Sequence, residues 1–306
     1  MNIGPYILSS DAVLGPMAGV SDLGFRTLAR RYGAGLTYTE MVSVCGLIYR
    51  NKQTEVLTAV APCEIPSAIQ LFGSDPEVFY KAASHEAVAK FDIIDVNMGC
   101  PVHKVVSRGE GSALMKDPAR AMDIVRALVD GSGGKPVTVK MRAGWDKPIA
   151  PEFALRMQEA GASLVTVHGR TRQQLYTGKA DPQVIREVVA AVRIPVIANG
   201  DVKTVEDYHR IKAETGADGV MIARGAIGRT QLFAEIRGET PEVDLQADFG
   251  LHLALLRETF SDRVACMLLK PHLIAAVSGR RNAKELRLSV GMAKTIEDIE
   301  AVIRLL

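Results

Sequence analysis

Cys100 is the residue in this sequence best placed to do chemistry, because it directly follows a predicted buried strand. The stretch Phe91–Met115 reads FDIIDVNMGCPVHKVVSRGEGSALM, and its apolar, β-branched start favours a buried parallel strand. Gly99 permits an unusual backbone and Pro101 ends strand pairing, so the thiol should lie on a rigid turn. A basic, glycine-bearing loop follows. Such a thiol suits proton transfer, and the alternative is a small buried cysteine without a function.

Polar side chains recur at the ends of the other predicted strands. In a parallel barrel, the C-terminal strand ends form the active-site face. Taken singly, Gln70 could satisfy loop backbone, Lys140 could pair with Glu40, and His168 could be a hydrogen-bonded core residue. Taken together, they are hard to explain without a shared site. The set is Glu40, Gln70, Asn97, Lys140, Arg142, His168, Arg170, Asn199, Asp201 and Arg224.

The loops after the last two predicted strands suit an anion. They read Asn199-Gly200-Asp201 and Ala223-Arg224-Gly225-Ala226, at the place where barrels often bind phosphate. Small residues let backbone N–H groups approach the anion, and the arginine adds charge. This predicts a phosphate-tailed cofactor. For a flavin, Lys140 and Gln70 would meet the pyrimidine edge and Pro16-Met17-Ala18 would form an apolar bed; a sugar-phosphate substrate remains the alternative.

Bulk properties limit the class of protein. The 306 residues leave room for one large domain and one small one. The net charge is only +2, so a polyanionic partner would have to meet a local basic surface. The four cysteines lack paired spacing, which favours a reduced cytosolic protein without a structural metal. We see neither a membrane-spanning run nor a signal peptide, and we expect a cytoplasmic protein.

Strand and helix patterns alternate through most of the chain. Acidic caps followed by proline mark several helix starts, and one such helix is predicted over Pro76–Lys90. Eight strands in this alternation predict a closed (β/α)8 TIM barrel, with a doubly wound open sheet as the alternative. The predicted strands are Val13–Met17, Leu36–Thr39, Ser67–Leu71, Ile93–Asn97, Val137–Met141, Leu164–His168, Val196–Asn199 and Gly219–Ala223.

Strand signals end near residue 244, and only amphipathic helices follow. We therefore predict a barrel domain over residues 1–243 and a small all-helical domain over residues 244–306. The predicted helices are Leu251–Phe260, Arg263–Val277, Ala283–Val290 and Thr295–Leu305.

The sequence resembles the tRNA-dihydrouridine synthases over nearly its whole length. The motifs occur in family order, and the tail Leu269–Arg287 resembles the family's helical RNA-binding domain. The motifs are GPMAGVSDLGFR (Gly15–Arg26), IQLFGSDPE (Ile69–Glu77), DVNMGCPVHKV (Asp95–Val105), GSALM (Gly111–Met115), VKMRAGW (Val139–Trp145), VHGRTRQQLYTGKAD (Val167–Asp181), IANGDV (Ile197–Val202) and MIARGAIG (Met221–Gly228).

The resemblance implies an FMN barrel that, with NADPH as reductant, reduces the C5–C6 bond of specific tRNA uridines. Reduced FMN would deliver a hydride to C6 and Cys100 a proton to C5. The implied FMN contacts are Pro16, Met17, Ala18, Gln70, Lys140, His168, Asn199, Gly200, Asp201, Ala223 and Arg224. The expected tRNA contacts are Asn97, Lys104, Arg142, Arg170, Arg172, Lys270, Arg280, Arg281 and Arg287. We expect a monomer.

Two departures from the family pattern and two rival functions accompany this prediction. Ala223 stands where the family commonly has glycine, and Ile274-Ala275-Ala276 stands where it commonly has aromatic residues.

A flavin dehydrogenase of a free dihydropyrimidine or dihydroorotate would use a similar turn, but it would not need the basic helical tail. An RNA-binding barrel without catalysis would not need Cys100, Lys140 and Gln70.

Overall fold

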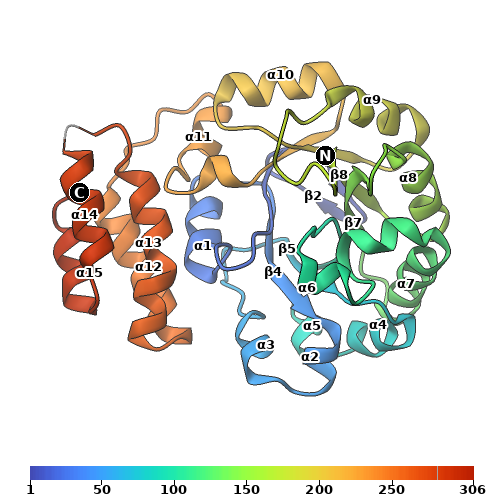
Figure 1. The fold of residues 1–306 in the computed structure, drawn as a ribbon, viewed down its shortest axis with the longest axis horizontal. Coiled ribbons are helices and arrows are strands. Elements are labelled where there is room, and N and C mark those ends of the chain that lie inside the picture. Colours follow the sequence, from blue (N-terminus) through green and yellow to red (C-terminus); the bar gives the residue numbers. More distant parts are fainter. Residues whose placement is uncertain (281) are drawn as a thin grey trace.

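Eight parallel strands close into a barrel in the computed structural model, which describes residues 1–280 and 282–306 (Figure 1). The strands follow chain order around the barrel, and the last strand closes on the first. This confirms the predicted TIM barrel and excludes the open sheet. The strands are β3 (Ala12–Leu14), β4 (Thr37–Ser43), β5 (Ser67–Phe72), β6 (Ile93–Met98), β7 (Val137–Gly144), β8 (Leu164–Thr171), β9 (Val196–Asn199) and β10 (Gly219–Ile222).

Helices cover the outside of the barrel, and their caps follow the sequence signals. Asp75, Asp117 and Asp181 each accept a backbone N–H in the first turn of the helix that follows, and α10 ends at the left-handed Gly216. The helices are α1 (Leu23–Arg31), α2 (Val44–Ile48), α3 (Lys52–Val56), α4 (Pro76–Ala83), α5 (Glu86–Ala89), α6 (His103–Val106), α7 (Pro118–Gly131), α8 (Ala150–Glu159), α9 (Pro182–Ala191), α10 (Val205–Thr215) and α11 (Leu232–Ile236), with 3₁₀ turns at Gly111–Lys116 and Arg224–Ala226.

Local structure differs from the sequence prediction at several places in the barrel. The helix predicted over Pro76–Lys90 is broken into α4 and α5, because Nδ1 of His85 accepts the Ala87 N–H at 3.1 Å and starts a new helix. A short antiparallel hairpin, β1 (Asn2–Ile3) with β2 (Tyr6–Ile7), was not predicted. Ile3 of this hairpin is fully buried in the apolar cluster at the N-terminal end of the barrel. The hairpin therefore closes the end opposite the predicted active-site face.

The barrel interior changes from apolar to polar along its axis. Residues of the N-terminal layer, such as Ile93 and Leu164, pack in the same cluster as the hairpin. Further along β6, β7 and β8, the buried residues include Asp95, Thr138 and Thr166, none of which has any exposed surface. Buried polar groups need hydrogen-bond partners inside the protein. This polar layer forms the floor beneath whatever binds at the C-terminal end of the barrel.

The C-terminal helices have a hydrophobic core of their own. They are α12 (Leu245–Thr259), α13 (Asp262–Ala276), α14 (Ala283–Met292) and α15 (Ile296–Ile303). All four predicted helices are present, and α12 begins at Leu245 rather than Leu251. Buried residues from Phe249 to Ile303 form a cluster distinct from the barrel core, and α12 packs beside α1 (Figure 1). These observations favour the domain division at residue 244, which stays a prediction.

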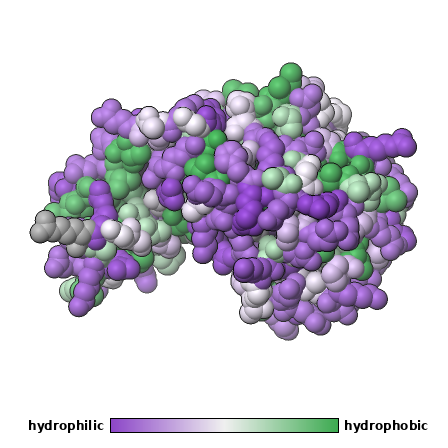
Figure 2. All heavy atoms as spheres, turned by 90° about the horizontal axis from the view of Figure 1, so that it is seen from above, coloured by the Kyte–Doolittle hydropathy of each residue, from purple (hydrophilic) through white to green (hydrophobic). Residues whose placement is uncertain are grey.

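The outer surface is mainly polar. Figure 2 shows hydrophilic residues over most of the face seen from above, with hydrophobic residues in separate patches on both lobes. Among the described residues, no helix combines the length and the apolar character that crossing a bilayer requires.

Candidate active site

A cavity of about 480 Å³ opens at the C-terminal ends of the strands. Its volume is typical of sites for small molecules and cofactors. All eleven residues predicted to hold the cofactor line it, and so do Cys100, Asn97 and Arg142. The structure therefore brings together residues that are more than two hundred positions apart in the sequence. Their roles in binding stay predictions.

The turn that carries Cys100 is held on both sides by hydrogen bonds. The Oδ1 atom of Asn97 accepts the backbone N–H groups of Gly99 at 3.1 Å and Cys100 at 2.8 Å. The Ser112 hydroxyl donates to the Cys100 carbonyl at 2.9 Å. Arg142 donates from Nε to the Gly99 carbonyl at 2.8 Å. These hydrogen bonds fix the backbone from which the thiol projects.

The thiol of Cys100 is kept protonated by its surroundings. Burial raises its pKa above the ordinary value, and the backbone N–H of Val102 and the charges of Arg142 and Lys140 offset this only in part. A thiol with a raised pKa holds its proton at neutral pH. The same nearby cations would stabilise the thiolate that is left after the proton is given up. This environment suits a proton donor better than a nucleophile.

Beneath the cavity lies a hydrogen-bonded network that the sequence did not reveal. Asp95 accepts Nε2 of Gln70 at 2.7 Å and the hydroxyl of Thr138 at 2.5 Å, and Oε1 of Gln70 accepts Nδ2 of Asn97 at 2.8 Å. Asp95 has no exposed surface, and burial raises its pKa to about 7. Gln70 retains one amide hydrogen and one carbonyl lone pair for a ligand above it. The sequence signals for Asp95 were an acidic residue inside an otherwise apolar strand and its place at the start of the motif Asp95–Val105.

The next two strands, β7 and β8, carry a cation and a neutral imidazole. Lys140 donates to Oδ1 of Asn199 at 3.2 Å, and burial together with the charge of Arg142 lowers its pKa to about 8. Nδ1 of His168 accepts the Arg170 N–H at 3.2 Å. Burial and the nearby cations lower the pKa of His168 to about 2. The ring is therefore neutral with its proton on Nε2, the nitrogen left to donate to a ligand.

The two loops after β9 and β10 approach each other closely at the far end of the cavity. An added Cβ on Gly225 would lie 2.2 Å from the Val202 carbonyl, so only glycine allows this approach. Gly200 and Asp201 both have positive φ angles, which turns the loop sharply after the strand. Arg224 lies at the rim, with its guanidinium 4.6 Å from the ring centre of Tyr176. Tyr176 lines the cavity and was not singled out by the sequence analysis.

Arg170 occupies a different place from the one expected of a tRNA contact. Its side chain is 3% exposed, and it forms a two-pronged ion pair with Asp201 at 2.9 and 2.7 Å. It also donates to the carbonyls of Thr177 and Gly178. A guanidinium engaged in this way suits the positioning of the Asp201 loop rather than contact with a phosphate on a large RNA.

The remaining predicted tRNA contacts do not form one cluster with the cavity. Lys104 and the helical-domain residues Arg280 and Arg287 are exposed. Arg172 lies half-buried, 4.7 Å from the ring centre of Trp145. Lys270 donates to carbonyls at the end of α14, among them that of Ala293. Arg281 lies outside the described residues.

Residues 13–298 match the family profile described as dihydrouridine synthase (Dus). The chain belongs to the dihydrouridine synthase family. This confirms the resemblance noted in the sequence. A protein named probable tRNA-dihydrouridine synthase from Rickettsia conorii is 39% identical over 304 residues, covering 95% of this chain and 92% of the relative. A protein named tRNA-dihydrouridine synthase B from Pseudomonas putida is 36% identical over 314 residues, covering 98% and 91%.

Solved structures share the fold of this dihydrouridine synthase family member. Morphinone reductase in complex with tetrahydroNAD has a TM-score of 0.55 at 13% identity, covering 81% of this chain and 92% of that one. Histamine dehydrogenase from Rhizobium has a TM-score of 0.62 at 12% identity, covering 89% and 50%. At these identities the likeness concerns the barrel fold alone.

Proposed function

We propose that this member of the dihydrouridine synthase family reduces the C5–C6 bond of uridines in tRNA, using FMN in the cavity and NADPH as reductant. The observation that carries the proposal is the position of the Cys100 thiol at the mouth of a cavity lined by all the predicted FMN residues. The names of the relatives from Rickettsia and Pseudomonas support tRNA as the substrate.

The residues present fit an FMN. Pro16, Met17 and Ala18 give an apolar wall at one side of the cavity, and Lys140 gives a cation. The neutral His168 offers an N–H to an anion or a carbonyl without adding charge. Bound FMN would supply the hydride that adds to C6 of the uridine.

Lys140 and Gln70 act on the polar edge of the ring in this proposal. Lys140 is a cation in a water-poor wall, where it stabilises negative charge on the edge more strongly than it would in water. Gln70 is fixed by Asp95 below and Asn97 beside it, so its remaining hydrogen-bonding capacity points in one direction. Preorganised polar groups of this kind need no rearrangement during the reaction.

Cys100 supplies the proton in this proposal. Its Sγ–H bond breaks as a C–H bond forms at C5 of the uridine, and the thiolate left behind is stabilised by Arg142 and Lys140. Asn97 and Ser112 hold the turn so that the thiol stays at the mouth while the base is bound. Solvent at the mouth returns the proton after the product leaves.

The tRNA has to bring a base out of its stack to reach this depth. Lys104, two residues after the cavity-lining Val102, and Arg280 and Arg287 on the helical domain are exposed cations that can meet phosphates. Because tRNA is the substrate, we place the protein in the cytoplasm, and we propose that it acts as a monomer.

The test is an anaerobic assay with purified protein, NADPH and unmodified tRNA transcripts. We expect a yellow protein that binds FMN and forms dihydrouridine in the tRNA. The same assay with free uracil and dihydroorotate separates this function from a free-base dehydrogenase. A protein that cannot bind FMN, or one that turns over the free pyrimidine as fast as the tRNA, would refute the proposal.

A further inference from the structure

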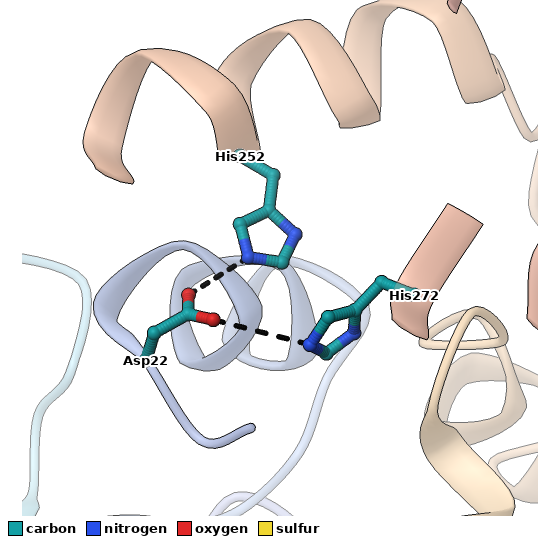
Figure 3. A group of neighbouring side chains, drawn as sticks. All are labelled: Asp22, His252 and His272. Carbon is teal, nitrogen blue, oxygen red and sulfur yellow. Dashed lines mark hydrogen bonds and ion pairs between the residues drawn. The ribbon is translucent and has the colours of Figure 1, made fainter. Parts of the chain in front are cut away.

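Three buried side chains that the proposed chemistry does not use meet between the barrel and the helical domain. Asp22 caps α1 on the loop after β3, His252 lies on α12 and His272 on α13 (Figure 3). The side chains of all three are 1% exposed. The cluster therefore joins two helices of the small domain to the first loop of the barrel, away from solvent.

The contacts within the cluster leave several polar atoms without partners. Nε2 of His252 lies 2.8 Å from Oδ1 of Asp22, a hydrogen-bond distance. Nε2 of His272 lies 3.9 Å from Oδ2 of Asp22, which is too long for a hydrogen bond. Among the described residues, Oδ2 of Asp22, Nε2 of His272 and Nδ1 of His252 have no hydrogen-bond partner. Buried polar atoms are seldom left unpaired, because each costs free energy.

Two of these unpaired atoms face each other. Oδ2 of Asp22 and Nε2 of His272 are both buried and lie 3.9 Å apart. A cation between them, within reach of the His252 ring, would supply the contacts that both atoms lack.

We propose that Asp22, His252 and His272 bind one divalent transition-metal ion of the zinc class, which links the two domains. Two imidazole nitrogens and one carboxylate oxygen are ligands that Zn²⁺ takes in proteins. The three ligand atoms lie within 4.8 Å of one another, so an ion between them needs only small side-chain movements to reach bonds of about 2 Å. A cavity of about 20 Å³, large enough for one water, adjoins both histidines.

Glycines at two points allow the helices to come close enough for this site. An added Cβ on Gly24 would lie 2.3 Å from Cδ2 of His252. An added Cβ on Gly228, whose φ is +67°, would lie 2.4 Å from the backbone nitrogen of Ala276 and 2.7 Å from the His272 carbonyl. A larger residue at Gly24 would push α12 away from α1, and one at Gly228 would push α13 away from the loop after the 3₁₀ turn Arg224–Ala226. The close approach that gathers the three ligands therefore depends on these two residues.

The position of the site indicates what the ion would do. Asp22 belongs to the same loop as Pro16, Met17 and Ala18, which line the active-site cavity. An ion held by this loop and by α12 and α13 fixes the helical domain relative to the cavity mouth. Since no side of the cluster is open to solvent, the ion is structural and takes no part in the reduction.

The test begins with tag-free protein purified with added Zn²⁺, freed of loose metal by gel filtration and analysed for elements by mass spectrometry. We expect about one zinc ion per chain. Co²⁺ added to metal-depleted protein should give new visible bands in a difference spectrum that subtracts the flavin. Chelation should lower the midpoint of thermal unfolding, and Zn²⁺ should restore it.

Matched variants locate the ion. His252→Gln and His272→Gln should each reduce the bound metal at least tenfold, whereas His209→Gln, a change of an exposed histidine on α10, should retain it. The proposal fails if His272→Gln holds as much zinc as the wild type, or if saturating Zn²⁺ leaves metal-depleted wild type unchanged in metal content and unfolding temperature. Should His272→Gln not fold, the comparison of depleted and reloaded wild type still decides. Wild type that binds no metal would mean that the histidines share a proton with Asp22, and this would overturn the proposal.

Discussion

Oδ1 of Asn97 accepts the backbone N–H of Cys100 at 2.8 Å, while Nδ2 of the same side chain donates to Gln70 at 2.8 Å. One amide group therefore joins the turn that carries the thiol to the polar layer under the cavity. Because Gln70 is in turn fixed by Asp95, the height of the thiol above the cavity floor is set by a continuous chain of hydrogen bonds. The proton donor and the floor are positioned as a unit.

Replacing Asn97 with alanine should slow the reaction far more than it weakens FMN binding. The turn loses the acceptor for two backbone N–H groups, and a misplacement of about 1 Å at a reacting group can cost on the order of 100-fold in rate. Asn97→Asp keeps that acceptor but loses the donor to Gln70, so we expect a smaller loss. Turnover with tRNA and FMN titration of both variants measure this. Equal activity of Asn97→Ala and wild type would show that the turn needs no such support.

Asp95 should make the protein less stable as the pH rises. Its pKa is raised from 3.8 to about 7 in the folded state, so the folded protein keeps a proton that the unfolded chain loses. This contribution to stability is complete below about pH 4 and is lost as the pH rises toward 7, by a few kcal/mol at most. In Asp95→Asn, the fall in unfolding free energy between pH 4.5 and pH 7.5 should be smaller. Denaturant unfolding at several pH values measures it.

The control for that experiment is Asp123→Asn, which changes an exposed carboxylate on α7. Its stability should follow the wild-type pH profile in parallel. A profile for Asp95→Asn that also runs parallel to wild type would mean that Asp95 is ionised in the folded protein at all these pH values.

The barrel fold and the residues that line its mouth could be predicted, because both depend on local sequence patterns. Strand runs, Asp-Pro helix starts and the rule that parallel strands point their C-terminal ends to one face together placed Gln70, Lys140 and Asn199 in one cavity. The turn at Cys100 could be predicted from Pro101. The unusual backbone expected of Gly99 is absent, because its φ is not left-handed and an added Cβ would meet no atom closer than 3.5 Å.

Features that depend on distant partners could not be predicted. Arg170 reads as an exposed cation in the sequence, yet its partner Asp201 lies on the next strand's loop and buries it. In the sequence, Asp95 is an acidic residue that interrupts an apolar strand. Its role is not visible locally, because its hydrogen-bond partners Gln70 and Thr138 lie on neighbouring strands. The helix break at His85 could not be predicted, because the apolar spacing continues through it. Capping by a histidine ring is rare and leaves no periodic signal in the sequence.

Arg170→Lys should distinguish a positioning role from a tRNA contact. A lysine cannot reproduce the two-pronged pair with Asp201 or the bonds to two carbonyls, so we expect a lower unfolding temperature and about tenfold weaker FMN binding. The charge is retained, so the salt dependence of tRNA binding should be unchanged. Arg170→Gln extends the test: its salt slope should also match wild type. A shallower slope for Arg170→Gln would instead identify Arg170 as a phosphate contact.

Arg280 and Arg287 should contribute to tRNA affinity through phosphate contacts. Replacing both with glutamine should weaken binding and reduce the slope of log Kd against log salt by about 1 to 2, because fewer counterions are released. The matched control replaces Arg126 and Arg210, which pair with acidic residues on outer barrel helices. Filter binding or fluorescence anisotropy at several salt concentrations measures both. Identical slopes for the test pair and the control pair would show that Arg280 and Arg287 do not contact tRNA phosphates.

The account depends most on the thiol as proton donor, and single-turnover reoxidation of the reduced enzyme by tRNA tests it most directly. Wild type and Cys100→Ala are reduced with NADPH without oxygen, mixed with unmodified tRNA, and followed by flavin absorbance. We predict that Cys100→Ala binds FMN and becomes reduced as wild type does, but that tRNA reoxidises it at least 100-fold more slowly. Reoxidation of Cys100→Ala by tRNA at the wild-type rate, with dihydrouridine as the product, would contradict the assignment.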